Sequence, residues 1–459
     1  MKKRVCLVLL AAGVLLWGTS LFAGGGGDKS SGGKADGGVT KIRVWSDNAS
    51  EKTVRDAQVA RFNAGEGKAK GIEIEYTVYG TNFAEAIDIA LKAGEAPELF
   101  RQDGKVFTNY VEAGLAIPLT DLPGGQALVD KYKGQLIPNL HTWNGKAYTL
   151  PYNVTTYKFV VNKDLFDAAG ISKLPTTWDE VRQDAKIITT KGNGQYYGFV
   201  LGLQSGWTMT TYFLFPNGAN TGLAVFDNEK LQYNFSAHLP WVSNVVGMIN
   251  DGSVFPGFEN LDADQMRAQF AAGRVAMIPG ASFDVGVYTD QFPANFNWVV
   301  IDVPAFTASG APYKAIVSAT NLLAVSSNAK KNPEKTMEVF NFFYNDENMA
   351  EMYEAGLYIP FRSEAVALAK KAPTARGFAE FANVPQKIIL LPAPDTEVAV
   401  EGIVYRDTII RLFSRAAGSD PAAVLRELDT RYNAALQKNV SSAVLNGFKA
   451  DATRVIRKE

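Results

Sequence analysis

The run Lys41-Ile42-Arg43-Val44-Trp45 opens the stretch that decides the fold, which extends to residue 102. The run is typical of a buried strand. Behind it, the sequence pattern predicts a helix over 51–63, a strand over 72–79, a helix over 83–93 and a strand over 98–102. Short β-rich runs that alternate with helical patterns are characteristic of βα units, whose strands pair in parallel. The stretch therefore predicts an α/β unit with helices packed on a mainly parallel sheet.

The same two patterns recur later in the chain. Residues 158–162 are apolar enough for a buried strand, and Thr177 and Glu180 form the capping box of a helix. One face of that helix is apolar, so we expect its residues in the core: Trp178, Val181, Ala185 and Ile188. Two further helices are expected after Asn332-Pro333 and Asp420-Pro421, where each pair supplies a cap and a first-turn proline. Further strands are predicted over 275–278, 298–303 and 321–325.

The overall composition is that of an ordinary globular protein. The chain has 459 residues, 47% of them hydrophobic, which is enough for two or three domains. Lys and Arg (46) nearly balance Asp and Glu (47), and no basic block is present to neutralise phosphates, so a nucleic-acid partner is excluded. The two histidines, His141 and His238, lie far apart without the spacing of a metal site. We therefore expect no metal and no cofactor.

The amino-terminal segment has the features of an export signal. Three basic residues precede an apolar stretch over 5–17, so we interpret residues 1–23 as a signal peptide and expect the mature protein to be periplasmic or extracellular. The segment 24–38 contains eight glycines and two serines and is interpreted as a flexible tether. The only cysteine, Cys6, lies at the start of the apolar stretch and not after it, so the sequence does not support a lipid anchor on the mature terminus.

Motifs of catalysis are absent from the sequence or incomplete. Gly202 to Gly206 lacks the serine position of a nucleophile elbow, and Gly192-Asn193-Gly194 lacks the remaining residues of a phosphate or dinucleotide loop. Tyr196-Tyr197 has no His/Asp cluster that would complete a ferric site, which favours a strand. Carboxylate pairs suited to glycoside cleavage stay open, because their separation cannot be read from the sequence.

Several phrases of the sequence resemble one family. The most specific is Gly145-Lys146-Ala147-Tyr148-Thr149-Leu150-Pro151-Tyr152-Asn153, followed by Val161 to Phe166 and by Pro175 to Glu180. Ala93 to Leu99, Glu112 to Leu119 and Phe270 to Met277 match other phrases in the same order. Together they resemble the extracellular solute-binding proteins of ABC sugar importers, the maltose-binding-protein-like family. Two departures are Glu98 in place of Asp, and Pro279 to Phe283 in place of the family's more common phrase.

The resemblance implies a two-lobed periplasmic-binding-protein fold, each lobe a mainly parallel sheet flanked by helices, joined by a hinge that the chain crosses several times. We assign residues 39–153 and 276–322 to the N-terminal lobe and residues 154–275 and 323–459 to the C-terminal lobe. The implied function is capture of a sugar between the lobes and delivery to the permease subunits of an ABC transporter. The resemblance also implies a monomer that is not an enzyme.

Ligands of open parallel sheets bind beyond the carboxyl ends of the strands, which selects the first candidate site residues. Asp47 and Asn48 follow the first strand, and Gln102 and Asp103 follow the third. Their carboxylate and amide groups suit sugar hydroxyls. Asp47 and Asn48 are equally suited to capping the next helix. Gln102 and Asp103 are equally suited to a solvated loop.

The remaining candidates rest on the resemblance. Tyr152 and Asn153 lie at the implied first hinge crossing. Trp207, in a loop after a strand over 199–203, corresponds to an aromatic sugar platform or is a core residue. Phe283 occupies the place of a family aromatic, and Tyr405 precedes a helix over 407–416 where relatives carry a stacking ring. An aromatic ring can stack on the apolar face of a pyranose.

Three alternative functions stay open from the sequence. One is a binding protein for another solute, such as a polyamine, a peptide or a ferric ion. Another is a secreted carbohydrate-active enzyme. A third is a sensor subunit that uses the same closure to present its sugar to a receptor or kinase.

Overall fold

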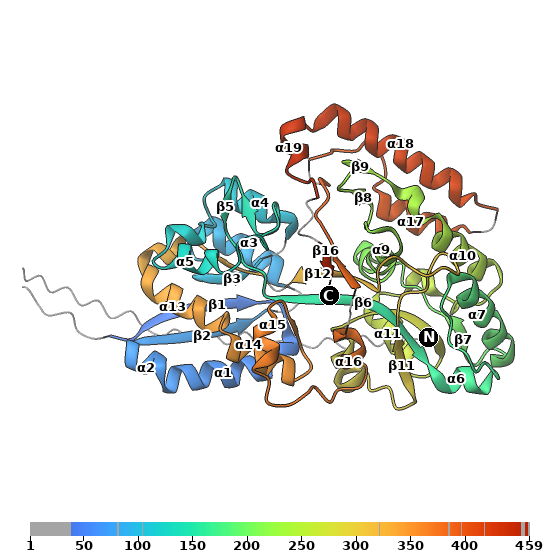
Figure 1. The fold of residues 1–459 in the computed structure, drawn as a ribbon, viewed down its shortest axis with the longest axis horizontal. Coiled ribbons are helices and arrows are strands. Elements are labelled where there is room, and N and C mark those ends of the chain that lie inside the picture. Colours follow the sequence, from blue (N-terminus) through green and yellow to red (C-terminus); the bar gives the residue numbers. More distant parts are fainter. Residues whose placement is uncertain are drawn as a thin grey trace, which may run out of the picture. The chain divides into compact units, whose positions relative to one another are not determined.

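The computed structural model describes residues 38–79, 82–102, 104–320, 322–383, 386–395, 397–416, 418–450 and 455–457. One compact unit spans Val39–Glu459, and Figure 1 shows its fold. The predicted signal peptide, and all of the predicted tether except Gly38, lie outside the described residues. Within the described part of the chain, no helix is both long enough and apolar enough to cross a membrane.

The smaller of the two main sheets confirms the predicted βα unit. Its order is β13-β3-β1-β2, with β13 at Leu323–Val325, β3 at Leu99–Arg101, β1 at Thr40–Ser46 and β2 at Ile72–Val78. β1 runs parallel to β2 and β3, whereas β13 joins the edge in antiparallel orientation. The accompanying helices are α1 (Lys52–Ala64), α2 (Glu66–Lys70), α3 (Phe83–Ala93), α4 (Gly104–Glu112), α5 (Gly125–Asp130), α13 (Pro333–Phe343), α14 (Asp346–Glu354) and α15 (Ser363–Ala367).

The larger sheet is mixed. Its main path is β16 (Val455–Arg457), β15 (Gln386–Ile389), β12 (Ala315–Thr320), β6 (Asn153–Asn162), β10 (Val275–Ala281) and β7 (Tyr197–Phe199). β11 (Trp298–Ile301) and β14 (Ile359–Pro360) also pair with β6. β6 is antiparallel to all four of these partners, β10, β11, β12 and β14, while β10–β7 and β12–β15 are parallel pairs. All ten residues of β6 are buried, which makes it the central strand.

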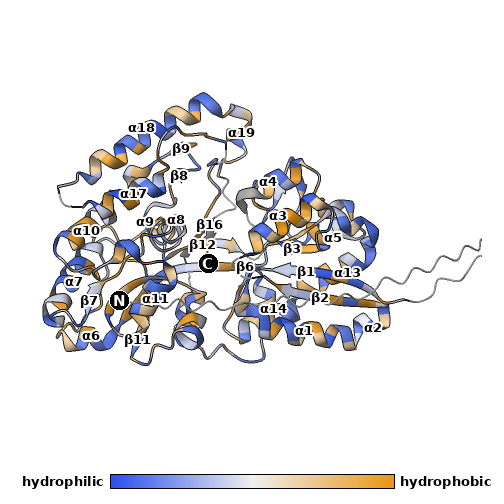
Figure 2. Cartoon of the chain, turned by 180° about the vertical axis from the view of Figure 1, so that it is seen from behind, coloured by the Kyte–Doolittle hydropathy of each residue, from blue (hydrophilic) through white to orange (hydrophobic). Residues whose placement is uncertain are grey.

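A second group of helices accompanies the larger sheet and its core. They are α6 (Lys163–Ala168), α7 (Trp178–Gly192), α8 (Gly206–Met209), α9 (Phe215–Thr221), α10 (Leu239–Asn250), α11 (Ala263–Ala271), α12 (Asp284–Gly286), α16 (Phe378–Ala382), α17 (Tyr405–Ser414), α18 (Pro421–Asn439) and α19 (Ser442–Asn446). Figure 2 shows hydrophilic and hydrophobic residues interspersed along α18. The burial of α18 follows helical spacing, with Leu425, Leu428, Tyr432 and Leu436 in the core. Two short hairpins complete the fold: β4–β5 (Thr142–Trp143, Lys146–Ala147) and β8–β9 (Phe226–Asp227, Gln232–Tyr233).

Helix starts follow the sequence signals, with one exception. The capping box of α7 is complete, since Thr177 accepts from the Glu180 N–H and the Glu180 carboxylate accepts from the Thr177 N–H. Asp420 likewise caps α18 through the Ala423 N–H. The side chain of Asn332 makes no capping bond to α13, so that part of the prediction is wrong. Only the proline at the start of α13 behaves as expected.

The predicted assignment of chain segments to lobes does not follow the sheets. The prediction places 276–322 with the first sheet, yet β10, β11 and β12 all belong to the larger sheet. It places 323–459 with the second sheet, yet β13, α13 and α14 complete the smaller one. Buried strands of either sheet have the same apolar composition, and their pairing is decided by contacts with distant segments. Sequence pattern alone therefore does not reveal which sheet a late strand joins.

The chain passes between the two main cores more than once. Tyr152 packs in the core of the smaller sheet, whereas Val154 belongs to the larger core. The chain returns between Val317 and Leu323, and leaves again between Ala365 and Phe378. Figure 1 shows β6 extending from beside the smaller sheet into the larger one.

Both histidines are buried and held neutral. His238 accepts a hydrogen bond from the Trp241 indole N–H at Nδ1, 2.8 Å away, and its Nε2 contacts the Ala224 carbonyl. His141 accepts the Ile137 N–H at Nδ1. In each neutral ring Nδ1 accepts a hydrogen bond, so a second ring proton would sit on Nδ1 and point at the N–H group that donates to it. Burial therefore lowers the pKa of His238 to about 4 and that of His141 to about 3.

Stability should fall on acidification because the unfolded chain binds these two protons first. Above about pH 6.5 the histidines are neutral in both states; below it, protonation favours the unfolded state until the folded pKa is reached. We expect each histidine to remove on the order of 2 kcal/mol between pH 6.5 and about 4.5. Thermal unfolding of the parent and His238→Gln, in which an amide retains both bonding partners, measures this. Parallel pH profiles for the two proteins would contradict it.

Candidate functional site

Residues that follow adjacent parallel strands meet at one edge of the smaller sheet. Asp47 follows β1, Arg101 ends the neighbouring strand β3, and their side chains form an ion pair. Asn48 donates from Nδ2 to the Tyr358 hydroxyl at 2.9 Å, and its Oδ1 accepts the Ser50 N–H at 3.2 Å. Asn48 therefore caps the next helical segment, the structural role considered for it from sequence. Asp47 stays partly exposed beside Arg101.

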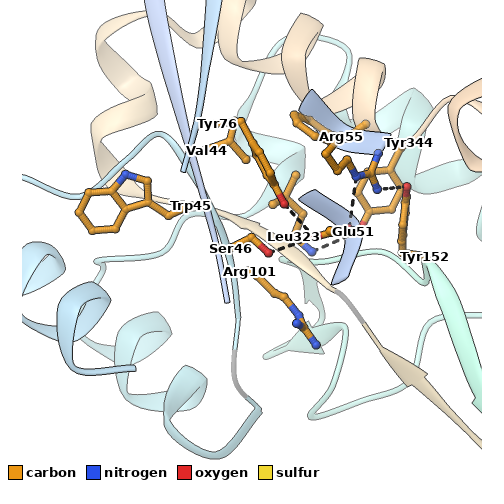
Figure 3. Close-up of a pocket in the computed structure, with 11 residues that line it drawn as sticks. Val44, Trp45, Ser46, Glu51, Arg55, Tyr76, Arg101, Tyr152, Leu323 and Tyr344 are labelled. Atoms are coloured by element: carbon orange, nitrogen blue, oxygen red, sulfur yellow. Dashed lines mark hydrogen bonds and ion pairs between the residues drawn. The ribbon is translucent and has the colours of Figure 1, made fainter. Parts of the chain in front are cut away.

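A buried cluster of charged and polar side chains lies beneath this edge and lines a pocket (Figure 3). We call it the Glu51 cluster, and its members are Glu51, Arg55, Ser46, Tyr76 and Tyr358. Glu51 accepts hydrogen bonds from Ser46 at 3.0 Å and Tyr76 at 2.9 Å, and it is also bonded by Tyr358. Arg55, one turn later on α1, pairs with Glu51 through Nε at 3.3 Å. Figure 3 shows the Ser46, Tyr76 and Arg55 side chains directed toward Glu51, with Trp45 on the opposite side of β1.

The electrostatics of the Glu51 cluster favour its charged form. Burial by itself would raise the pKa of Glu51, but the Arg55 charge and the Tyr358 hydrogen bond, aided by Arg101 and Tyr76, outweigh it and lower that pKa. Burial by itself would lower the pKa of Arg55, but Tyr152 and Glu51 raise it. The pair is therefore a buried ion pair with its hydrogen bonds satisfied, which is the condition under which burying charge is tolerated.

The predicted hinge residues lie beside this cluster. Arg55 donates to the Tyr152 hydroxyl, and the Tyr152 ring packs edge-on against Tyr344 and Tyr358. Tyr152 and Asn153 are both about as buried as core residues. Tyr152 thus lines the pocket wall, and in this conformation it presents little surface to a ligand.

Among the predicted ligand residues that the structure describes, Gln102 has an unused buried group. Its backbone N–H donates to Leu322 at 3.0 Å, and its side chain is buried. Among the described residues, nothing hydrogen-bonds its Oε1. An unpaired buried acceptor carries a desolvation cost that a ligand hydroxyl would remove. Asp103 lies outside the described residues and stays a prediction.

A second group of candidates lies at the corresponding edge of the larger sheet. Strands β7 and β10 are parallel neighbours, so the segments after them emerge at the same edge. Trp207 follows β7 and Phe283 follows β10, and these residues are 46% and 36% exposed. β7 ends at Phe199, earlier than predicted, and Trp207 lies in the short helix α8 instead of a loop. Ser205 begins that helix by accepting the Trp207 N–H.

Trp207 and Phe283 share one neighbour, Arg267 of α11. Its guanidinium carbon lies 5.8 Å from the Trp207 ring centroid and 5.7 Å from that of Phe283. Arg267 pairs with the fully buried Asp284 at 2.9 Å and with Asp264 at 2.7 Å. Burial works against the charge of Arg267, but Asp284 and Tyr212 raise its pKa. We call Arg267, Asp264, Asp284 and Tyr212 the Arg267 cluster.

The prediction for Tyr405 requires correction. Tyr405 is the first residue of α17, only 5% exposed, and its ring packs among Phe235 and Tyr432. Its hydroxyl faces Asp395 at 3.3 Å. The Arg406 guanidinium also lies 4.9 Å from the ring centroid, so a ring enclosed in this way has no free face for a sugar. We therefore drop Tyr405 from the candidate site.

Neither site has the ligand set of a metal centre. Across the described residues, no group of three or more His, Cys, Asp and Glu side chains gathers closely enough to hold an ion. The carboxylates at both edges are instead engaged by arginines. The two sites can therefore offer a ligand hydrogen bonds from the polar side chains at the strand ends, together with two exposed aromatic rings.

The sequence and the fold match a known group of proteins. The sequence pattern that describes bacterial extracellular solute-binding proteins matches residues 45–350. The chain belongs to that family. This solute-binding protein is 25% identical over 306 residues to a binding protein of Brucella abortus strain 2308, covering 66% of this chain and 71% of the relative. It is 24% identical over 326 residues to the sn-glycerol-3-phosphate-binding periplasmic protein of Rhizobium meliloti, covering 68% and 72%.

Among solved structures, this solute-binding protein is similar to the GacH receptor of Streptomyces glaucescens, determined unliganded and with acarbose. The TM-score is 0.66 at 17% identity, over 87% of this chain and 99% of the receptor. At that identity the likeness concerns the fold, which is the two-lobed α/β fold of periplasmic solute-binding proteins. The predicted fold class is confirmed.

Sequence reasoning missed most of the polar framework of both edges. Glu51, Arg55, Arg101, Tyr358 and Arg267 were not candidates. The sequence did contain a signal for Arg101, because Arg101 directly precedes Gln102, which was chosen as a candidate for its place at the end of the same strand. The others contact partners far away in sequence: Tyr358 reaches Glu51 across 307 residues.

Proposed function

We propose that this solute-binding protein captures an uncharged saccharide and delivers it to the permease of an ABC importer in a periplasmic or extracellular setting. The observation that carries the proposal is the exposure of Trp207 and Phe283 against one buried guanidinium, at the edge of a sheet where ligands of this architecture bind. Exposed rings held in this way suit the apolar face of a sugar.

The charge balance at the two edges supports a neutral ligand over a phosphorylated one. Arg101 is paired with Asp47, and Arg267 with Asp264 and Asp284. A phosphate would have to displace carboxylates from these arginines. We therefore favour a saccharide over sn-glycerol-3-phosphate, the ligand in the name of the Rhizobium meliloti relative.

Capture would work by a shift in the populations of the open and closed conformations. A saccharide that contacts both sheet edges only when they approach each other binds the closed form more tightly, and this difference in affinity drives closure. The crossings near Tyr152, Thr320 and residues 366–377 are the segments where the backbone would bend. Under this proposal the ligand leaves unchanged, and the protein is not an enzyme.

The test is a titration of the protein with maltotriose, raffinose, acarbose and sn-glycerol-3-phosphate, followed by calorimetry and melting. A true ligand at a hundredfold excess over its Kd stabilises the fold by about 2.7 kcal/mol. We expect Trp207→Ala and Phe283→Ala each to weaken saccharide binding at least tenfold, the equivalent of about 1.4 kcal/mol. The control is Ile187→Ala, which removes an exposed apolar side chain from α7.

Two outcomes would contradict the proposal. One is undiminished saccharide affinity in both aromatic variants. The other is binding of sn-glycerol-3-phosphate alone. Cleavage of an aryl glycoside by the parent protein would instead support the carbohydrate-active enzyme that the sequence left open.

A further inference from the structure

The geometry points to Arg267 as the positioning residue that fixes Trp207 and Phe283 as one two-ring surface for the saccharide. This inference rests on the proposed function for the role of the rings, while the positioning itself is measurable without any ligand. Arg267 need not touch the sugar. It acts by holding the rings that do.

Arg267 is immobilised from several directions. Nε donates to Asp284 at 2.9 Å and to the Tyr212 hydroxyl at 2.8 Å, and Nη1 donates to Asp264 at 2.7 Å. Only 9% of its side chain is exposed. Because the guanidinium is planar with donors in a fixed fork, these bonds determine its plane as well as its position.

The anchor beneath Arg267 is itself built into the fold. Asp284 has no exposed side-chain surface, and its Oδ2 accepts the Ala281 N–H at the end of β10. The Tyr212 hydroxyl donates to Asp284 Oδ1 at 2.8 Å. Tyr212 lies in the π-helical segment Thr210–Leu214 that joins α8 to α9, so the cluster ties this segment to α11 and α12.

Both rings pack on this anchor. Trp207 has its edge-on contact with the Tyr212 ring, 5.8 Å between centroids, and its cation–π contact with Arg267. Phe283 meets the same guanidinium. The distance between the Trp207 and Phe283 ring centroids cannot exceed the sum of their distances to the Arg267 guanidinium carbon. One saccharide unit, or two adjoining units, can cover that distance. Exposed side chains otherwise sample several rotamers, and fixing them beforehand removes an ordering cost from binding.

Arg267→Lys would keep the positive charge but lose the planar, forked set of guanidinium donors, so the new side chain cannot hold Asp264, Asp284 and Tyr212 together. Arg267→Met leaves Asp284 buried and unpaired, which threatens the fold. The double variant Arg267→Met/Asp284→Asn removes both charges and keeps the protein testable. Arg182→Met, which breaks the α7 ion pair with Asp251, is the matched control.

The ligand-free measurement is the near-ultraviolet circular dichroism that Trp207 contributes, obtained as the difference between each protein and its Trp207→Phe counterpart. We expect this difference band to lose at least half its intensity in Arg267→Lys and in the double variant, and to stay unchanged in Arg182→Met. A Trp207 band of parental intensity in both folded Arg267 variants would overturn the inference, whether or not any sugar binds.

The ligand measurement uses raffinose and maltotriose by calorimetry. We expect at least a tenfold loss of affinity in Arg267→Lys, and a much smaller further loss when Trp207→Ala is added, because the two changes remove the same surface. Full additivity of the two losses would overturn the inference. If neither the parent nor any variant binds these sugars or acarbose, the proposed function fails, and the dichroism result still decides whether Arg267 positions Trp207.

Discussion

Replacing Arg55 by Met should destabilise the protein by about 3–5 kcal/mol, because the change leaves the Glu51 carboxylate buried without its ion-pair partner. Both side chains are less than a tenth exposed, so water cannot replace the lost interaction. The substitution also removes the donor to the Tyr152 hydroxyl, next to the first crossing. Urea unfolding followed by circular dichroism measures the change.

Two companion variants isolate the buried charge as the cause. Glu51→Gln/Arg55→Met removes both charges and should recover much of the loss, since a neutral pair in the interior is often no worse than an ionic one. Lys52→Met breaks the exposed pair with Asp56, which lies one position after the Glu51–Arg55 pair in the sequence, and it should change stability by no more than about 0.5 kcal/mol. Equal losses in Arg55→Met and Lys52→Met would contradict the argument.

The second large effect is expected at Gly198 in β7. A Cβ atom at this position would overlap the Cα and carbonyl oxygen of Ala185 in α7, and neither backbone atom can move without shifting the helix. Overpacking of this kind costs about 1–3 kcal/mol or more, and we expect Gly198→Ala to fall at or above the upper end. The melting temperature and the yield of folded protein report the effect.

Gly286 provides a control of opposite sign. It has helical angles, with φ −65° and ψ −32°, and an added Cβ would meet no atom within 4 Å. Gly286→Ala should therefore leave stability unchanged or raise it by up to about 1 kcal/mol, because alanine has less conformational freedom to lose on folding. A loss at Gly286 as large as that at Gly198 would mean that sterics are not the cause.

Local signals in the sequence were sufficient for most elements of the fold. The strand and helix periodicities located β1, α1, β2, α3 and β3, and the capping box located the start of α7. They failed for the membership of β10 and β13 in the sheets, because that membership depends on pairing with strands far along the chain. The short π-helical and helical turns around Trp207 have too few residues to produce a periodic pattern.

The candidate site was predictable only in its outer parts. Positions after the carboxyl ends of strands identified Asp47, Asn48 and Gln102, and the resemblance identified Trp207 and Phe283. The framework that holds them, Glu51 with Arg55 and Arg267 with Asp284, consists of charged residues that look solvent-exposed in sequence and that distant segments carrying Tyr358 and Tyr212 enclose in the fold. Tyr405 failed for the reverse reason, since an aromatic beside a helix start has the same appearance whether its ring faces solvent or core.

The pairing of β13 with β3 affects how this protein is made. Translation releases Leu99 and its neighbours long before Leu323, so the edge of β3 has no partner while most of the polypeptide is still being synthesised. Met337 and Phe340 of α13, which complete the adjacent core, emerge later still. Closing so long a loop is slow, and an unfinished sheet with an open edge is prone to aggregation. The smaller sheet and its core therefore stay incompletely packed until these late segments have been synthesised.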